Sequence, residues 1–212
     1  MTRTGADYVA LVLAAGASRR MGADQNKLLE EVGGRPLVAG VVEAFVEAGV
    51  DRVLVVVGHE AERIEAVLAG RPGVEWVANA AWSEGMGSSL AAGASVLAKE
   101  AEGRLDGVLV CVGDLPGLSP EVIGQVCAAH AESASPAAIC VPTHGGRDGH
   151  PVLFGRVHLD ALVAQSGDRG ARGLLLEYAD DVRRVPVESA GIFEDVDTPE
   201  QLERARREVG SR

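Results

Sequence analysis

Three short runs of apolar residues constrain the fold of this chain more than any other feature of its sequence. They are Tyr8–Ala15, Arg52–Gly58 and Gly107–Val112, and they are apolar at nearly every position. A strand with one face in water alternates apolar and polar residues, whereas a strand covered by helices on both faces is apolar throughout. The three runs therefore predict buried strands of a parallel sheet that lies between helices.

Helical patterns separate these runs, as parallel pairing requires. Apolar residues recur at helical spacing from Val38 to Val46, and Gly49 is placed to end that helix. Further helices are expected over 61–68, 88–99, 156–165 and 171–177, from Ser119-Pro120 onward and from a capping box at Thr198–Gln201. Further strands are expected over 74–78, 138–142, 151–154 and 182–187. The alternation predicts one α/β domain over 1–212, with a mostly parallel central sheet flanked by helices.

Charge and cysteine content exclude several classes of protein. The 212 residues include 20 basic and 31 acidic ones, which give a formal net charge of −11 and disfavour a nucleic-acid-binding protein. The cysteines Cys111, Cys127 and Cys140 are isolated, which favours buried thiols over a metal site and fits a reducing cytoplasm. The chain shows no signal-peptide pattern, and no apolar run approaches the roughly 20 residues that cross a bilayer. We therefore expect a cytoplasmic protein without a membrane partner.

The residues after the first apolar run, Ala14–Lys27, form a loop rich in glycine and alanine. Small residues directly after a buried strand let backbone N–H groups approach a phosphate chain, and Arg19, Arg20 and Lys27 add positive charge. The loop contains neither a Walker A sequence nor the G-x-G-x-x-G dinucleotide fingerprint. On its own it indicates phosphate binding, and the alternative is a solvated basic turn.

Six short motifs follow one another along the chain. LAAGASRRMG with NKLL precedes Gly85–Leu90 (GMGSSL), Gly113–Pro116 (GDLP), Gly149–Pro151 (GHP), Gly167–Arg172 (GDRGAR) and Asp195–Pro199 (DVDTP). In this order they resemble the molybdopterin nucleotidyltransferase group of the NTP-transferase superfamily, over nearly the whole chain. The resemblance implies a Rossmann-like nucleotidyltransferase fold. It also implies a nucleotide-binding part over about 7–115 and a part over about 116–200 that binds the acceptor and completes the metal site.

The resemblance implies that Asp114 and Asp197 hold Mg²⁺, the expected cofactor. Asp114 follows a predicted strand, at the edge of the sheet where α/β proteins bind ligands. One or two carboxylates together with substrate phosphates are a usual environment of Mg²⁺. The alternatives are structural, namely a turn residue before Pro116 for Asp114 and a residue leading into the cap at Thr198 for Asp197. Asp195 is close enough in sequence to compete with Asp197 as the second ligand.

Further roles are implied residue by residue. Lys27, Arg20 and Asp114 would be catalytic, with Lys27 at the α-phosphoryl group and Arg20 at the β- and γ-phosphates. The implied nucleotide-binding residues are Leu13, Ala14, Ala15, Gly16, Arg19, Arg20, Lys27, Gly87, Ser88 and Ser89. The implied acceptor-binding residues are His150, Asp168, Arg169 and Arg172. Two alternatives stay open: the two serines as N-caps of the next helix, and the last two arginines as solvent-exposed loop residues.

The motifs also bear on the choice of nucleotide. LAAG and GMGSSL resemble the cytidylyltransferase branch, whereas the GTP-using branch carries LAGG, and Leu115 departs from the GDQP of the cytidylyl branch. The leading hypothesis is transfer of CMP from CTP to the phosphate of molybdopterin, with a molybdenum hydroxylase or its maturation factor receiving the product. The alternatives are guanylyl transfer to molybdopterin, transfer to another phosphorylated small molecule, a non-catalytic cofactor-binding protein, and an NAD(P)H-dependent oxidoreductase. The missing dinucleotide fingerprint disfavours the last of these.

Overall fold

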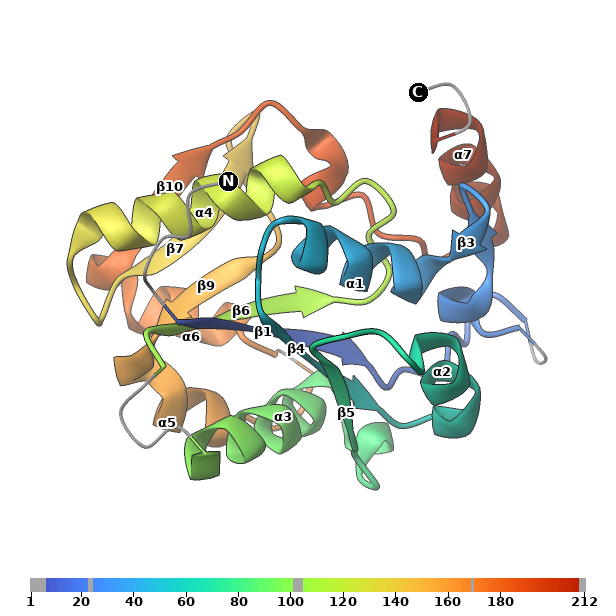
Figure 1. The fold of residues 1–212 in the computed structure, drawn as a ribbon, viewed down its shortest axis with the longest axis horizontal. Coiled ribbons are helices and arrows are strands. Elements are labelled where there is room, and N and C mark those ends of the chain that lie inside the picture. Colours follow the sequence, from blue (N-terminus) through green and yellow to red (C-terminus); the bar gives the residue numbers. More distant parts are fainter. Residues whose placement is uncertain (1–6, 23–24, 101–104, 169, 210–212) are drawn as a thin grey trace.

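A computed structural model describes residues 7–22, 25–100, 105–168 and 170–209, in which strands and helices alternate along most of the chain (Figure 1). The strands are β1 (Tyr8–Ala14), β2 (Glu31–Val32), β3 (Arg35–Pro36), β4 (Arg52–Val57), β5 (Val74–Ala78), β6 (Gly107–Val112), β7 (Ile139–His144), β8 (Arg147–Asp148), β9 (Val152–Gly155) and β10 (Val182–Pro186). The α-helices are α1 (Leu37–Glu47), α2 (Ala61–Leu68), α3 (Met86–Glu100), α4 (Pro120–Ser133), α5 (Leu159–Val163), α6 (Arg172–Glu177) and α7 (Pro199–Val209).

The main sheet has the order β10-β7-β9-β6-β1-β4-β5, with β8 paired to β7 beside this path. β1 lies between β4 and β6 and runs parallel to both, and the pairs β4–β5 and β7–β10 are also parallel. β9 runs antiparallel to both of its neighbours. The predicted mostly parallel sheet is confirmed, and the direction of β9 is a feature that its apolar sequence does not reveal.

Helices cover both faces of the sheet and form two apolar cores. Successive residues of β1 alternate between them, because side chains along a strand point to opposite faces. Ala10 and Val12 belong to the core beneath α1, α2, α4 and α7, whereas Leu11 and Leu13 belong to the core beneath α3, α5 and α6. Full burial of each larger side chain contributes roughly 1.5–3 kcal/mol. β1 therefore serves both cores, which explains why its run is apolar at every position.

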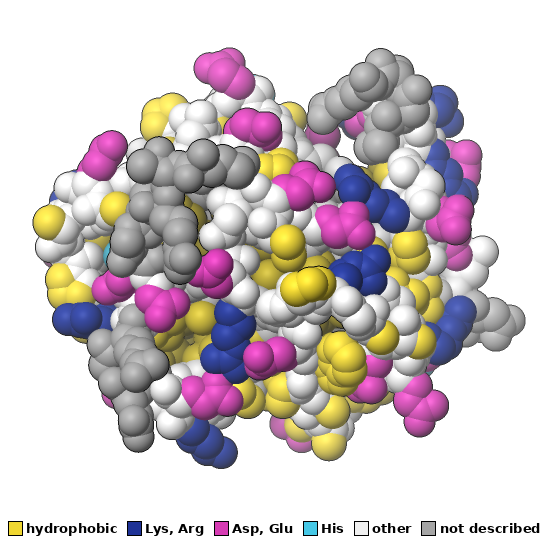
Figure 2. Space-filling model, in the orientation of Figure 1, with side chains coloured by type: hydrophobic (Ala, Val, Ile, Leu, Met, Phe, Trp, Pro, Cys, Tyr) yellow, Lys and Arg dark blue, Asp and Glu magenta, His cyan; other side chains and the backbone are white. Residues whose placement is uncertain are grey.

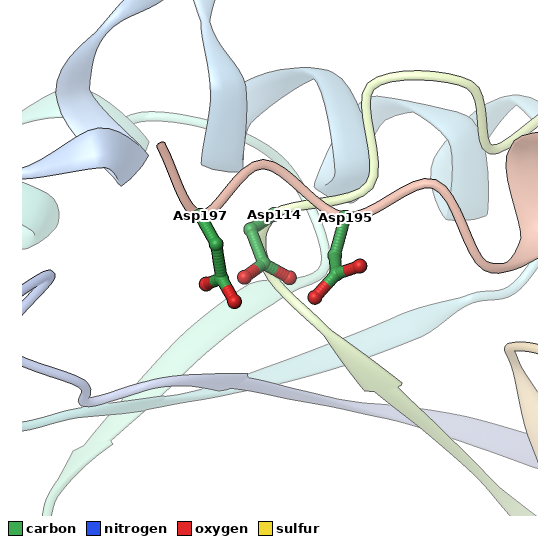
Figure 3. A group of neighbouring side chains, drawn as sticks. All are labelled: Asp114, Asp195 and Asp197. Carbon is green, nitrogen blue, oxygen red and sulfur yellow. The ribbon is translucent and has the colours of Figure 1, made fainter. Parts of the chain in front are cut away.

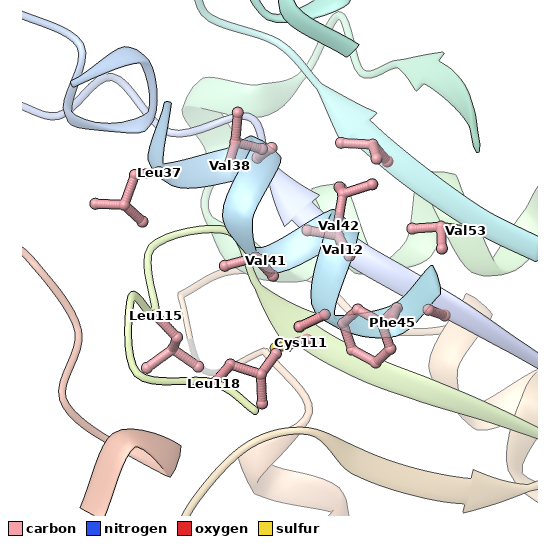
Figure 4. Close-up of a cluster of buried hydrophobic side chains, with 14 of the residues drawn as sticks. Val12, Leu37, Val38, Val41, Val42, Phe45, Val53, Cys111, Leu115 and Leu118 are labelled. Carbon is pink, nitrogen blue, oxygen red and sulfur yellow. The ribbon is translucent and has the colours of Figure 1, made fainter. Parts of the chain in front are cut away.

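The core beneath α1 anchors the loop that follows β6 (Figure 4). Leu115 and Leu118 of that loop belong to the same apolar cluster as Val41 and Phe45 of α1. Leu115 is only 1% exposed and directly follows Asp114 in the chain. Packing of an apolar side chain thus fixes the backbone that carries a predicted metal ligand.

Two of the predicted helix starts are present. The Ser119 hydroxyl accepts from the N–H of Val122 and caps α4. At the start of α7 the N–H of Gln201 donates to the Thr198 hydroxyl at 3.3 Å, and the Gln201 side chain accepts from the N–H of Thr198 at 2.9 Å. Both caps satisfy amides that have no partner within their own helix, as the sequence patterns predicted.

The helix expected over 156–165 is divided. A 3-10 turn covers Arg156–His158, and α5 follows it with only five residues. The N–H groups of Arg156 and Val157 donate to the carbonyl oxygens of Asp106 and Pro136, in neighbouring loops. These contacts tie the start of the segment to the sheet and leave a short helix after it.

The distribution of charged side chains and the state of the cysteines are as expected from the sequence. Acidic and basic side chains are interspersed on the face shown in Figure 2, with apolar side chains between them and without one broad basic area. Cys111, Cys127 and Cys140 are buried free thiols, as predicted. No helix within the described residues is long and apolar enough to span a bilayer.

Candidate active site

The loop after β1 is shaped by its own hydrogen bonds. Ser18 has a φ of 50°, and its carbonyl oxygen accepts from the N–H of Met21 at 2.9 Å. The Ser18 hydroxyl accepts from the N–H of Lys27 at 3.2 Å. The Asn26 side chain accepts from the N–H of Leu28 at 3.1 Å and caps the 3-10 turn that begins at Lys27. These contacts fix the backbone of Lys27 independently of its side chain.

Asp114 follows β6 at the carboxyl edge of the sheet, next to the end of β1. The N–H of Gly113 donates to the carbonyl oxygen of Leu13 at 3.0 Å, which holds the two chain segments together. Asp114 is 9% exposed, and a carboxylate at this depth requires a charged or hydrogen-bonding partner. Lys27 supplies one, because its Nζ lies 2.5 Å from Asp114 Oδ2.

The segment before α7 brings two more carboxylates to the same edge. It packs so closely on the loop after β6 that a Cβ built on Gly191 would lie 2.2 Å from the carbonyl oxygen of Gly117. Val196 is buried, and its N–H donates to the carbonyl oxygen of Asp114 at 3.1 Å. Figure 3 shows the aspartates on either side of Val196 turned toward the same side as Asp114.

These contacts assemble a cluster of charges. Asp114, Asp195 and Asp197 each place a carboxylate oxygen within 4.8 Å of the other two (Figure 3). The Lys27 ammonium also lies 2.6 Å from Asp197 Oδ1, so it bridges two of the three carboxylates. Arg20 pairs with the other oxygen of Asp197 from the exposed side. The structure therefore brings together both predicted metal ligands, the competing Asp195 and two of the predicted basic residues.

The charges shift one another's protonation. Burial raises the pKa of Asp114 above its usual range, and the nearby Lys27 charge offsets only part of that effect. Burial also acts to raise the pKa of Asp197, but the hydrogen bonds and charges of Lys27 and Arg20 outweigh it and lower that pKa. Burial acts to lower the pKa of Lys27, but the two carboxylates raise it overall. Lys27 is therefore held as an ammonium ion.

The cluster suits a hard divalent cation by the chemistry of its donors. Carboxylate oxygens are the ligands that Mg²⁺ and related cations prefer. Asp114 Oδ1 is buried and has no hydrogen-bond partner among the described residues. Such an atom is unfavourable in a folded protein unless a ligand satisfies it. The donor set therefore fits a divalent cation, with Asp114 at its centre.

A hydrogen-bond network at the end of β5 orders the start of α3. Asn79 is buried, and its Nδ2 donates to the hydroxyls of Ser88 at 2.9 Å and Ser89 at 3.1 Å. Its Oδ1 accepts from the N–H of Ala81 at 2.9 Å. The Ser88 hydroxyl is directed at the carbonyl oxygens of Ala81 and Gly85, each at 2.9 Å. The carboxamide of Asn79 thus sets the positions of both predicted nucleotide-binding serines.

The alternative interpretation of these serines as N-caps is wrong. α3 begins at Met86, so Ser88 and Ser89 lie within its first turn. An N-cap hydroxyl accepts from an N–H two or three residues further along the helix. These hydroxyls accept instead from the Asn79 side chain, which belongs to a different element.

The first turn of α3 packs directly on the loop after α5. The N–H of Gly87 donates to the carbonyl oxygen of Gly167 at 2.7 Å. A Cβ on Gly87 would lie 2.4 Å from the carbonyl carbon of Ser166, and one on Gly85 would lie 2.4 Å from a carboxylate oxygen of Asp168. Close backbone approach requires these glycines. The predicted nucleotide-binding loop and the predicted acceptor-binding loop are therefore packed directly against each other.

The end of β1 lies beside an aromatic pair. Ala15 is buried, and its carbonyl oxygen accepts from the N–H of His59 at 3.1 Å. The rings of His59 and Trp82 lie 5.2 Å apart. Leu13 and Ala14 are also buried as the last residues of β1, whereas the predicted phosphate-binding residues that follow lie further out along the loop. Gly16 has no heavy atom within 4 Å of a built Cβ, and Arg19 is exposed.

His150 lies beside the acidic cluster. Its backbone N–H donates to the carbonyl oxygen of Ile192 at 2.7 Å, and its ring Nδ1 lies 3.5 Å from the carbonyl oxygen of Val110. Burial lowers the pKa of His150, and the Val110 carbonyl and the charges of Asp114 and Asp195 offset this only in part. His150 is therefore a neutral neighbour of the carboxylates.

The other predicted acceptor-binding residues lie in and after the loop that follows α5. Asp168 is exposed at the loop surface, next to Gly85. Arg172 is exposed at the start of α6. Arg169 lies outside the described residues. The structure therefore places Asp168 next to the residue that precedes α3, and not in contact with the carboxylates of the acidic cluster.

Comparison with known proteins assigns the family. Residues 10–182 match the MobA-like NTP transferase domain. The chain belongs to the MobA-like NTP transferase family. It is 33% identical over 199 residues to nicotine blue oxidoreductase of Paenarthrobacter nicotinovorans, which covers 92% of this chain and 94% of that protein. It is 37% identical over 153 residues to bifunctional protein GlmU of Geobacter metallireducens, over 71% of this chain and only 30% of the length of GlmU.

Solved structures confirm the fold of this MobA-like chain. Rv0371c from Mycobacterium tuberculosis H37Rv has a TM-score of 0.80 at 24% identity and covers 96% of this chain and 100% of its own. Its complex with manganese has a TM-score of 0.75 at 22% identity, over 96% and 100% of the two chains. A nucleotidyl transferase from Methanothermobacter thermautotroptrophicus has a TM-score of 0.77 at 26% identity, over 96% and 98%. The predicted Rossmann-like nucleotidyltransferase fold is therefore confirmed.

Sequence reasoning missed two features that build this MobA-like site. Asn79 was not predicted, although a polar residue directly after a strand at the ligand-binding edge is a usable signal. The contact between Gly117 and Gly191 joins segments that are far apart in the sequence. No local pattern identifies such a contact.

Proposed function

We propose that this MobA-like protein transfers a nucleoside monophosphate, CMP from CTP, to the phosphate of a molybdopterin-type acceptor and releases pyrophosphate. The observation that carries the proposal is the position of Lys27, whose ammonium lies between Asp114 and Asp197. A basic loop suited to phosphates and an acidic cluster suited to a divalent cation meet at that point. Phosphoryl transfer depends on this combination of positioning and charge neutralisation.

The proposed reaction needs little covalent chemistry from the protein. An oxygen of the acceptor phosphate attacks the α-phosphorus, and the bond to the β-phosphate oxygen breaks so that its electron pair leaves with pyrophosphate. The acceptor phosphate is already an anion at neutral pH, so His150 is not assigned as a general base. Lys27 would neutralise charge on the α-phosphoryl oxygens, while Arg20 and Arg19 would hold the β- and γ-phosphates.

The acidic cluster would hold the cofactor, for which we propose Mg²⁺. Asp114 would be the main ligand and Asp197 the second, with Asp195 within reach of the same point. The cation would supply electrostatic stabilisation of the phosphate oxygens. The manganese complex of Rv0371c, a protein of the same fold, supports a divalent cation.

The two substrates would approach from either side of this cluster. The base and ribose would lie over the end of β1, near Ala15 and the start of α3, where Asn79 orders the two serines. The alanine in LAAG favours CTP through its resemblance to the cytidylyl branch. His150, Asp168 and Arg172 would contact the acceptor.

A screen of pyrophosphate release tests the proposal. The purified protein is incubated with Mg²⁺, each of the four NTPs, and either molybdenum-bound molybdopterin or a panel of sugar and polyol phosphates. We expect release from CTP with molybdopterin, and a loss of at least about 100-fold in Lys27→Gln. Arg184→Gln is the matched control, since Arg184 is an exposed arginine paired with Asp148, and it should keep full activity.

The other outcomes of this screen identify the alternatives. Release from GTP but not from CTP would mean guanylyl transfer, and release only with another phosphate would mean a different acceptor. Turnover of no NTP with any acceptor would favour a non-catalytic cofactor-binding protein.

A second candidate function comes from a single comparison. Nicotine blue oxidoreductase is similar to this chain over 94% of its length, so an NAD(P)H-dependent reduction is the alternative of a different class. The sequence lacks the dinucleotide fingerprint that usually binds such a cofactor. Oxidation of NAD(P)H with a dye acceptor, in the absence of pyrophosphate release from any NTP, would replace the transferase proposal.

A further inference from the structure

Lys27 fills the space between two carboxylates of the acidic cluster. Its Nζ lies 2.5 Å from Asp114 Oδ2 and 2.6 Å from Asp197 Oδ1, so it is in direct contact with both carboxylates. The Lys27 side chain is 14% exposed, so solvent screens these contacts only weakly. The ammonium thereby uses one oxygen from each of the two residues that a divalent cation would need.

We propose that Lys27 keeps a free divalent cation out of the acidic cluster, so that the cation and the nucleoside triphosphate bind together. A triphosphate would draw the ammonium to its own oxygens, and this would free Asp114 and Asp197 for the cation. The inference rests on the proposed function for the identity of the nucleotide. Its first part, exclusion of the free cation, depends only on the geometry of Lys27.

The charge of the cluster supports this role. Three carboxylates face two cationic side chains, Lys27 and Arg20, so three negative and two positive charges leave a net charge of −1. Removal of the Lys27 charge would leave −2 and would expose two carboxylate oxygens. Both changes attract a dication.

Lys27 does not satisfy the cluster completely. Asp114 Oδ1 remains buried without a hydrogen-bond partner among the described residues, even though Lys27 contacts the other oxygen of the same carboxylate. An acceptor left free at this depth indicates that the cluster takes a further ligand. The lysine therefore holds the carboxylates together without completing their coordination.

The lysine can leave without unfolding its loop. Its backbone N–H bonds to the Ser18 hydroxyl at 3.2 Å, and the turn that begins at Lys27 is capped by Asn26. Neither contact involves the ammonium. The flexible four-carbon stem lets the charged end move while the backbone stays in place.

Direct binding of Mn²⁺ in the absence of nucleotide tests exclusion of the cation. Mn²⁺ is titrated into the purified protein, and free Mn²⁺ is measured by electron paramagnetic resonance. We expect Lys27→Met and Lys27→Gln to bind Mn²⁺ at least about tenfold more tightly than the wild type, which corresponds to a usual coupling between sites. Lys27→Arg keeps the charge and should show no gain.

Two further variants locate the effect. Arg20 contacts Asp197 from outside, with 73% of its side chain exposed, so Arg20→Gln should raise Mn²⁺ affinity less than the Lys27 variants. Arg184→Gln, at an ion pair on β10, should leave it unchanged. If both Lys27 variants bind Mn²⁺ no more tightly than the wild type, the proposal is overturned.

Joint binding is tested by adding CTP. Wild-type protein with Mn²⁺ at a fixed low concentration is passed through a desalting column with and without CTP, and retained Mn²⁺ and CTP are measured. We expect both to be retained together, and equal Mn²⁺ retention without CTP would contradict the inference. If the wild type releases pyrophosphate but Lys27→Met binds Mn²⁺ no more tightly than the wild type, the proposed function stands and this inference is overturned. If Lys27→Met binds Mn²⁺ more tightly but the wild type turns over no NTP, the proposed function is overturned and the exclusion of the free cation stands.

Discussion

The two ends of the central strands both bury polar side chains, and they do so in different ways. At the amino end of β1 the Tyr8 hydroxyl lies 2.9 Å from His130 Nδ1 and 3.5 Å from the carbonyl oxygen of Cys127. At the carboxyl end Lys27 and Asp114 bury charges of opposite sign. The amino end therefore buries neutral groups, whereas the carboxyl end buries paired charges.

Each end contains a buried polar atom without a hydrogen-bond partner among the described residues, namely His130 Nε2 and Asp114 Oδ1. At the amino end burial lowers the pKa of His130, so the ring adapts by staying neutral. At the carboxyl end Lys27 and Arg20 hold negative charge in place. The two unpartnered atoms therefore differ in their surroundings, which are a neutral ring at the amino end and paired charges at the carboxyl end.

The largest expected effect is at the carboxyl end, in Asp114→Asn. The amide is nearly isosteric with the carboxylate but lacks its charge, so pyrophosphate release should fall by at least about 100-fold. The melting temperature should change little, because burial already disfavours the charged form of Asp114. Activity and thermal unfolding are measured on the same preparation. Unchanged turnover would reject Asp114 as the main metal ligand.

A smaller loss of activity is expected from Gly191→Ala, which removes no charged side chain. The new Cβ would lie 2.2 Å from the carbonyl oxygen of Gly117, so the segment that carries two of the carboxylates must move away from the loop after β6. We expect Mn²⁺ affinity in the presence of CTP, and activity, to fall roughly 10- to 100-fold, as for changes at other residues that support metal ligands indirectly. Gly124→Ala, in α4 with nothing within 4 Å of the new Cβ, is the matched control and should leave both unchanged. An equal loss in both variants would show that the contact does not position the carboxylates.

The smallest effect is expected at the amino end, in His130→Phe, and it concerns stability alone. Because burial lowers the pKa of His130 in the folded state, the unfolded chain takes up the proton first as pH falls below the ordinary value of 6.5. The wild-type free energy of unfolding should therefore decrease below about pH 6.5, by about 1.4 kcal/mol for each pH unit between the two pKa values.

The variant lacks this titration, so its stability should depend less on pH over the same range, and its activity at neutral pH should equal that of the wild type. Urea unfolding between pH 5 and 7.5 measures the difference. An equally steep loss of stability in wild type and variant would show that His130 is not the group that titrates.

The same comparison shows what could be predicted from sequence. Apolar runs identified the central strands, because a strand that serves two cores has no polar face, and the motifs after those runs located the carboxyl edge. The motif match favoured Asp197 over Asp195, and this choice stays a prediction, because both residues flank the buried Val196 and reach the same point. A local sequence pattern indicates which side chains of a segment point in the same direction. It does not indicate which residues of distant segments they contact.

Features that depend on distant segments were beyond prediction for the same reason. The contact between Gly117 and Gly191 and the antiparallel direction of β9 are properties of the packed molecule. The pairing of Tyr8 with His130 joins the start of β1 to α4, and nothing in either segment identifies the partner. Strand-end residues followed from local sequence, whereas their partners required the structure.

Only one of the three clustered carboxylates lies in the loop that directly follows a strand of the main sheet. Asp114 continues from β6, whereas Asp195 and Asp197 lie on a segment joined to it by the N–H of Val196. That amide can exchange its hydrogen with solvent only when the segment lifts from the Asp114 carbonyl oxygen. Its exchange rate in heavy water therefore measures how often the acidic cluster comes apart, and a cation bound to both sides would slow that single amide more than the amides of β1.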